Sequence, residues 1–206
     1  MSGERVLFLP IEVSLREFDA KVLIAAEAVS RGWAVVLGHK FDVAKEAVRF
    51  GPGGVYLGKG VLRPTVDALY DRLSESGVKI VGQNEEAGLQ FSSFDEFFAL
   101  SPSMEKVGAL DAYFCWGSDD FDYLSAWLSL HNPSATAKVI LTGSARATLW
   151  GEAGREYFSE EVEGYRKKYG NYVLFATSFA SANYIVSDAA YFKFMRDSAL
   201  FPTFSQ

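Results

Sequence analysis

The 206-residue chain has few of the residues that build stapled or metal-bound domains. Its single cysteine, Cys115, excludes an intramolecular disulfide framework and a cysteine-based zinc cage. Its two histidines, His39 and His131, disfavour a histidine-rich metal site, so we predict no bound metal. Basic charge is also scarce, with 20 Lys and Arg against 26 Asp and Glu and no long basic run. A nucleic acid is therefore not an expected partner.

Long hydrophobic runs are missing as well. The apolar stretches fall short of the ~18–20 residues that a membrane-spanning helix needs. The first twelve residues lack the basic leader and small-residue cleavage site of an export signal. We therefore expect no transmembrane segment and a cytoplasmic location, and peripheral association with the inner membrane through a partner stays open.

Glycine is absent where a dinucleotide or phosphate loop would need it. The segment after the first apolar run, 12–16, has no glycine to let the backbone approach a pyrophosphate. The glycine-rich segment 51–54 precedes an apolar run instead of opening a helix, so it is interpreted as a turn. NAD-dependent and P-loop chemistry are disfavoured, and we predict no cofactor.

Short apolar runs alternate with segments of helical periodicity. The runs are continuously hydrophobic and rich in β-branched residues, which is typical of buried strands, and they cover residues 6–13, 34–38, 55–57, 78–81, 112–116 and 138–141. Aromatic residues make up 15% of the chain, enough for a substantial core. The pattern predicts an α/β fold, a Rossmann-like parallel sheet with helices on both faces.

The last quarter of the chain differs from the rest. We expect residues 1–150 to form the Rossmann-like domain. Residues 154–169 are strongly charged and indicate an exposed helix or connector, and 172–177 indicate one further strand. One strand cannot bury a core, so 151–206 is interpreted as a connector helix and the start of an incomplete second domain.

The expected sheet selects a set of candidate ligand-binding segments. In open parallel sheets, ligands bind outside the carboxyl ends of the strands. The residues just after the expected strands are 12–19, 38–40, 58–59 and 83–88, and the second of these segments contains Lys40.

Two polar clusters within these segments carry chemistry: Glu12, Arg16, Glu17 and Asp19 in the first segment, and Glu85 and Glu86 in the last. Arg16 can hold an anionic or hydroxyl-rich ligand, and an acid such as Glu12 at the end of a buried strand needs a partner. Asp19 is either part of the same site or a favourable partner for the helix dipole. The adjacent carboxylates of Glu85 and Glu86 are candidate general bases, or else a helix cap and a solvated side chain.

Two Gly/Ser loops follow later strands. The first begins at Trp116, and the second comprises Thr142, Gly143, Ser144, Ala145 and Arg146. The second loop could donate backbone N–H groups to an anion, helped by its arginine, although many such loops are only turns. Cys115 lies within an apolar strand, where a buried, unreactive thiol is expected.

These segments together resemble a known family. The likeness runs in order from about residue 6 to about 185, through segments 10–20, 38–40, 84–88, 114–117, 142–146, 168–174 and 177–179. In this respect the chain is similar to the bacterial surface carbohydrate biosynthesis proteins. No single motif is diagnostic, but the order and spacing of the motifs are fairly specific.

The resemblance implies a glycosyltransferase-like protein of the GT-B kind, acting in capsule or O-antigen assembly. In that architecture the N-terminal domain carries the glycan acceptor and the base, and the C-terminal domain holds a nucleotide-sugar donor. By resemblance, Glu85 or Glu86 becomes the base, and Arg16, Glu17 and Asp19 become acceptor-side residues.

Two functional hypotheses stay open. The first is a sugar transferase or its N-terminal acceptor-side part, incomplete as an enzyme in these 206 residues. The second is a non-catalytic α/β module that binds a sugar or another ligand and has lost its donor domain. The family's usual loop of Thr-Gly-Asn-Pro-Arg with a later Asp is replaced here by Ser144, Ala145 and Thr148, which favours the second. If the face against which a second domain would pack is apolar and exposed, it would favour formation of a homodimer.

Overall fold

The computed structural model describes residues 5–59, 64–83, 107 and 109–175. The chain divides into two compact units, residues Met1–Ser159 and Glu160–Gln206. The first unit contains the sheet and all of the sites discussed below.

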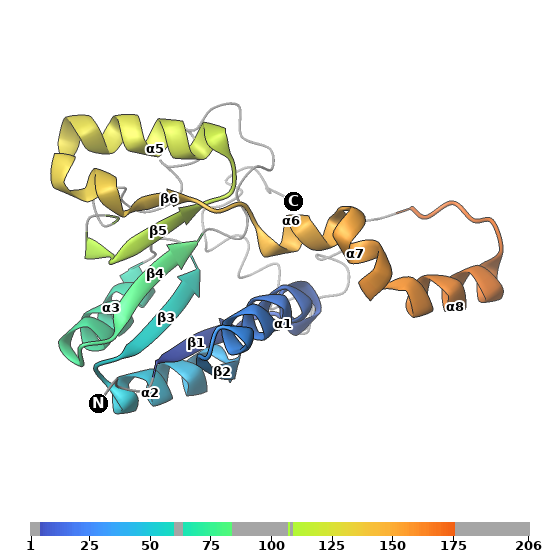
Figure 1. Ribbon diagram of the computed structural model, residues 1–206, viewed down its shortest axis with the longest axis horizontal. Coiled ribbons are helices and arrows are strands. Elements are labelled where there is room, and N and C mark those ends of the chain that lie inside the picture. Colours follow the sequence, from blue (N-terminus) through green and yellow to red (C-terminus); the bar gives the residue numbers. More distant parts are fainter. Residues whose placement is uncertain (1–4, 60–63, 84–106, 108, 176–206) are drawn as a thin grey trace, which may run out of the picture. The chain divides into compact units, whose positions relative to one another are not determined.

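The described strands form one sheet in which every pairing is parallel. The sheet has six strands in the order β2-β1-β3-β4-β5-β6 (Figure 1). Their bounds are β1 Val6–Ile11, β2 Ala34–His39, β3 Gly54–Lys59, β4 Lys79–Gln83, β5 Ala112–Cys115 and β6 Val139–Leu141. The predicted parallel α/β fold is confirmed, and every one of the six expected strands forms within a few residues of its expected bounds.

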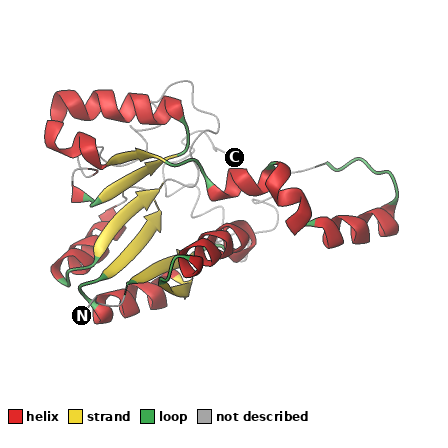
Figure 2. Ribbon diagram, viewed as in Figure 1, coloured by secondary structure: helices red, strands yellow, loops and turns green. Residues whose placement is uncertain are grey.

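Helices connect the strands, as Figure 2 shows in red. Their bounds are α1 Ser14–Ser30, α2 Lys40–Phe50, α3 Pro64–Glu75, α5 Ser118–His131, the 3₁₀ helix η2 Pro133–Lys138, α6 Ala145–Trp150, α7 Glu152–Tyr157 and α8 Ser159–Tyr169. Helix α2 begins at Lys40, directly after the last residue of β2, and Asp42 lies in its first turn.

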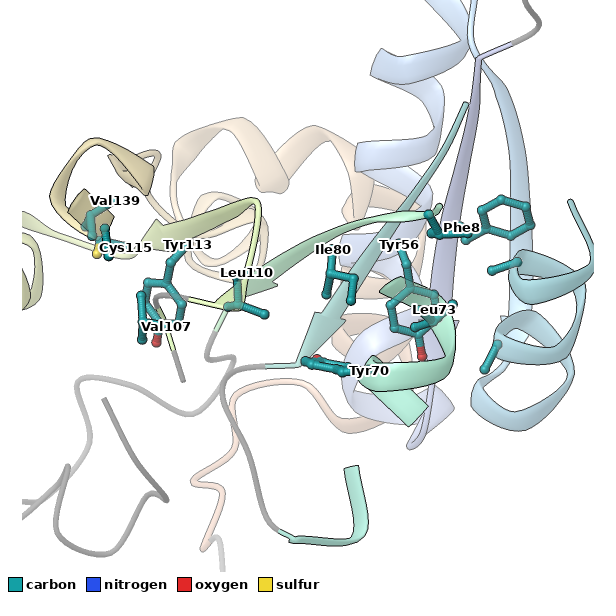
Figure 3. Close-up of a cluster of buried hydrophobic side chains, with 14 of the residues drawn as sticks. Phe8, Tyr56, Tyr70, Leu73, Ile80, Val107, Leu110, Tyr113, Cys115 and Val139 are labelled. Atoms are coloured by element: carbon teal, nitrogen blue, oxygen red, sulfur yellow. The ribbon is translucent and has the colours of Figure 1, made fainter. Parts of the chain in front are cut away.

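The two faces of the sheet carry separate apolar clusters. The larger cluster joins β1, β3, β4, β5 and β6 to α2, α3 and α5, and its labelled members in Figure 3 include Phe8, Tyr56, Leu73 and Tyr113. The smaller cluster centres on Leu9, whose neighbours include Ile24 and Ala25 of α1 on the opposite face. Successive strand residues point to opposite faces, so a continuously apolar strand feeds both clusters.

The ladder between β1 and β3 ends early. These strands pair at Val6, Leu7 and Phe8 of β1, whereas β1 pairs with β2 as far as Ile11 and β3 pairs with β4 as far as Lys59. Pro10 lies beyond the last residue of β1 that pairs with β3, and proline has no N–H to donate to a ladder. The two strands are therefore unpaired to each other at their carboxyl ends.

The unpaired carboxyl ends of β1 and β3 lie where the strand order of the sheet reverses. The strand order runs outward from β1 in both directions, because β2 lies on one side of it and β3 on the other. In open α/β sheets with this order, the gap between β1 and β3 is the switch point at which ligands bind. The switch point and the end of the ladder coincide.

The second unit is described only in its first part. Helix α8 is exposed along its whole length, as its charge pattern predicts. Residues 172–175 form no strand, contrary to the prediction for 172–177, of which 176–177 lie outside the described residues. A strand needs a neighbour to satisfy its backbone groups, and the described segments supply none here.

Candidate functional site

Five charged side chains converge where β1, β2 and β3 end. They come from the segment after β1, from the start of α1, from the start of α2 and from the end of β3. We call them the switch-point cluster: Glu12, Arg16, Glu17, Lys40 and Lys59. Four of the five belong to the substrate-binding residues that the sequence predicts. The structure places these four together, and it adds Lys59.

Glu17 is the buried centre of the cluster. Its side chain has 0% relative exposure, although it is a carboxylate on the first turns of α1. It accepts hydrogen bonds from the backbone N–H groups of Glu12 at 2.8 Å and Val13 at 3.1 Å. Lys59 Nζ lies 2.5 Å from Glu17 Oε1. These donors satisfy a charge that would otherwise be costly to bury, and they fix the segment between β1 and α1.

The electrostatics of the buried pair follow from these contacts. Burial alone would raise the pKa of Glu17, but the hydrogen bonds from Glu12 N–H and Lys59 outweigh it, so the net pKa is lowered. Burial alone would lower the pKa of Lys59, and its contacts with the two carboxylates raise it instead. Both groups are therefore charged at neutral pH.

Glu12 forms the outer part of the cluster. Lys40 Nζ lies 2.5 Å from its Oε1, and Lys59 Nζ lies 3.0 Å from its Oε2. The hydrogen bonds from Lys40 and Lys59 lower the pKa of Glu12 to about 2, despite some opposing effect of burial. A carboxylate so strongly paired is a poor proton acceptor at neutral pH. Glu12 is thus suited to binding and not to acting as a base.

A second polar group lies further along the same edge of the sheet. Gln83 Nε2, at the end of β4, donates to the carbonyl of Gly143 at 2.8 Å, and Thr142 Oγ1 lies 3.5 Å away. Trp116 follows β5, and its indole Nε1 is buried without a hydrogen-bond partner among the described residues. Gln83 is the register partner of Lys59 in the ladder between β3 and β4, so this group adjoins the switch-point cluster at Gln83. Trp116 lies further off, because β5 is three strands from β1, about 14 Å away.

The remaining predicted site residues have visible structural contacts. Ser144 caps α6, where its Oγ accepts from the N–H of Ala147 at 3.4 Å, and Arg146 lies over the ring of Trp150 at 5.3 Å. Asp19 accepts a hydrogen bond from Tyr157 Oη at 2.8 Å, which joins α1 to α7. The predicted bases Glu85 and Glu86 lie outside the described residues.

The loop after β5 repeats the arrangement after β1. Asp120 accepts from the backbone N–H groups of Trp116 at 3.0 Å and Gly117 at 2.9 Å, as Glu17 does from its own loop. Burial and Asp120 together raise the pKa of the Cys115 thiol to about 12. Cys115 is fully buried, which confirms the expectation of a buried thiol.

Lys59 is the one residue of the switch-point cluster that the sequence does not predict as a site residue. It lies in the segment 58–59 selected by strand-end geometry, but a single lysine at the end of an apolar strand gives no further signal. Its partners lie 42 and 47 residues earlier in the chain. Only the sheet topology could reveal them.

The described part of the chain places two limits on the chemistry. Within it, no three His, Cys, Asp or Glu side chains are arranged to hold a metal ion. None of its helices combines the length and apolar character needed to cross a membrane. Comparison with family models, with curated proteins and with solved structures finds no match to this chain. Its function must therefore be argued from the fold, the cluster and the resemblance.

Proposed function

We propose that this chain is the acceptor-side, saccharide-binding domain of a glycosyltransferase of the GT-B kind that assembles a bacterial surface polysaccharide. The observation that carries the proposal is the switch-point cluster at the unpaired ends of β1 and β3. It supplies charged hydrogen-bonding groups at the edge where open α/β sheets bind ligands. The order and spacing of the sequence motifs add the family resemblance.

The cluster suits a hydroxyl-rich ligand for physical reasons. Carboxylates accept hydrogen bonds from sugar hydroxyls, and ammonium groups donate to their oxygens. The buried Glu17 holds the loop and Lys59 in place, so the outward groups are positioned before a ligand arrives. Such preorganisation lowers the entropy lost when a ligand binds.

In the proposed reaction, a general base removes the proton from an acceptor hydroxyl. The oxygen then forms a bond to the anomeric carbon of the donor sugar, and the bond from that carbon to the nucleotide phosphate breaks. Glu85 or Glu86 remains the proposed base, because each follows β4 and Glu12 has too low a pKa. The resemblance assigns the nucleotide sugar to a second domain, so we expect this chain alone to bind it weakly.

Binding by the purified chain tests the proposal. A panel of bacterial surface glycans is screened against the wild type, Lys40→Gln and Lys79→Gln by saturation-transfer NMR. Lys79 is a matched control: it pairs with Asp111 at 2.8 Å, but at the opposite, amino end of the sheet. We expect Lys40→Gln to weaken glycan binding and Lys79→Gln to leave it unchanged. Absence of glycan binding, or equal binding by all three proteins, would count against the proposal.

The catalytic part needs a separate test in the producing cell. The complete gene is replaced by versions encoding Glu85→Gln or Glu86→Gln, and the surface polysaccharide is quantified alongside the amount of protein. Loss of polysaccharide at normal protein level in either strain supports the base assignment. Normal polysaccharide in both strains refutes it.

One observation favours the alternative of a non-catalytic binding module. The Thr-Gly-Ser loop, which differs from the family's usual sequence, is engaged in structural contacts: Ser144 caps α6, and Thr142 Oγ1 donates to the carbonyl of Cys115 at 3.3 Å. On this alternative, glycan binding persists and depends on Lys40, whereas neither glutamate substitution affects the polysaccharide.

A further inference from the structure

The Glu12 carboxylate bridges two ammonium groups, and this geometry has a consequence for the ligand. Each of its oxygens takes a different partner, Lys40 at 2.5 Å and Lys59 at 3.0 Å. An external oxyanion bound at this place would use the same two donors. The bridge is also open to solvent, since the side chains of Glu12, Lys40 and Lys59 are 44%, 36% and 27% exposed.

The two carboxylates of the cluster differ in how firmly they are held. Glu17 is fully buried and accepts from two backbone N–H groups as well as from Lys59. Among the described residues, the Glu12 carboxylate contacts the two lysines, and its side chain is partly exposed. Glu12 can therefore rotate into solvent while Glu17 keeps Lys59 in position.

The charge balance favours such an exchange. Three cations and two carboxylates give the cluster one excess positive charge, although the whole chain carries a net charge of -6. When Glu12 turns away, the excess becomes two positive charges around a partly exposed position. An arriving anion restores the balance, whereas a neutral sugar does not.

We propose that Glu12 is an internal stand-in for the oxyanion of an acidic sugar, which displaces it from between Lys40 and Lys59. The inference rests on the proposed saccharide-binding function and specifies its substrate class. The shared chemistry is a sugar that carries a carboxylate or a phosphate. Glu12 also keeps the two lysines positioned when no ligand is bound, and it competes with weakly bound anions.

The proposal predicts that removing the charge of one site residue strengthens the binding of the ligand. Glu12→Gln removes the internal competitor and is expected to raise the affinity for an acidic sugar by about tenfold, the effect of one charge-assisted hydrogen bond. Lys40→Gln removes one of the two donors and is expected to lower the affinity by about tenfold. Lys40 is partly exposed and contacts Glu12, whereas Glu17 is held by Lys59 and two backbone N–H groups, so the loss of Lys40 spares the buried pair.

Titration of the full chain followed by NMR tests these expectations, with glucuronate, glucose 1-phosphate and glucose as probes. Glucuronate binding identifies the carboxylate as the source of the oxyanion, and preferential binding of glucose 1-phosphate identifies the phosphate. Lys79→Gln is the control and is expected to change no affinity. The melting temperature of each variant is measured, so that a folding defect is recognised.

Three outcomes overturn the inference: Glu12→Gln binds acidic sugars no more tightly than the wild type, Lys40→Gln binds them equally well, or glucose binds as tightly as both anions. These outcomes are distinct from failure of the proposed function. If neutral glycans bind in a manner that depends on Lys40 and anions gain nothing from Glu12→Gln, the acceptor-side function stands and the oxyanion site is wrong.

Discussion

Replacing the buried Glu17 by glutamine tests whether the switch-point cluster organises the fold. The substitution keeps the size of the side chain and removes its charge. Glutamine keeps one acceptor oxygen, but its NH₂ group replaces the other and there faces a donor. In place of Oε2 it faces the Glu12 N–H at 2.8 Å, and in place of Oε1 it faces the Val13 N–H at 3.1 Å and Lys59 at 2.5 Å. Lys59 would also lose its buried partner.

The expected cost is large. Hydrogen bonds to a charged group contribute about 1.5–3 kcal/mol each, and breaking a buried ion pair costs about 3–5 kcal/mol. For a domain of this size each kcal/mol shifts the melting temperature by about 2–4 °C. We therefore expect Glu17→Gln to lower the melting temperature by roughly 10 °C at pH 7, measured by circular dichroism.

The same helix supplies a matched control. Glu27 pairs with Arg31 at 2.6 Å, but its side chain is 61% exposed, against 0% for Glu17. An exposed pair at this spacing contributes about 0.3–0.5 kcal/mol, so Glu27→Gln is expected to change the melting temperature little. If the two variants melt within about 2 °C of each other, the reasoning about Glu17 is refuted.

The pH dependence gives an independent check on the same residue. The pKa of Glu17 is lowered in the folded protein, so its stabilisation is present above the ordinary value of 4.5 and is lost as pH falls through the folded pKa. The melting temperatures of wild type and Glu17→Gln should therefore converge as the pH falls below 4.5 and through the lowered pKa of folded Glu17. A difference that stays constant down to pH 2 would contradict this cause.

Three further predictions concern the core. A Cβ at Gly58 would lie 2.2 Å from Tyr70 Oη, so Gly58→Ala is expected to cost about 1–3 kcal/mol in urea unfolding, and less in a Tyr70→Phe background. The Cys115 thiol, with a pKa raised to about 12, should react with a thiol reagent at pH 7.5 only after unfolding. Burial raises the pKa of Tyr56 and of Tyr70, so stability should fall as the pH rises above about 10, where the unfolded state loses these protons.

Each of these predictions has an outcome that contradicts it. An equal cost of Gly58→Ala in both backgrounds would show that the hydroxyl of Tyr70 is not the obstacle. Prompt labelling of one thiol per native chain would show that Cys115 is accessible. Stability that stays level from pH 9 to pH 12 would show that the buried phenols do not control the alkaline limit.

Much of the fold follows from local sequence patterns. The apolar runs predict the six strands because a strand buried on both faces must be hydrophobic throughout. Gly32, with a φ of 79°, ends α1 as its position after a basic residue indicates, because glycine adopts this conformation without strain. The strand expected at 172–177 does not form over 172–175. Local propensity is overridden there because the described segments supply no strand for it to pair with.

The candidate site was predicted only in part. The rule that ligands bind at strand ends selects Glu12, Arg16, Glu17 and Lys40, and these side chains do converge. Trp116 and Thr142 lie about 14 Å or more from β1 along the edge of the sheet, because two other strands separate β1 from β5. Chain order does not contain that information.

The amino-acid sequence by itself determined the alternation of strands and helices, because hydrophobic periodicity acts over a few residues. Tertiary structure alone decided the order of the strands and the point at which β1 and β3 cease to pair. It thereby decided that Lys59 meets Glu12 and Glu17, which lie more than forty residues earlier. An ion pair between such distant residues forms only when the sheet brings two strand ends to one edge, and no local pattern encodes that meeting.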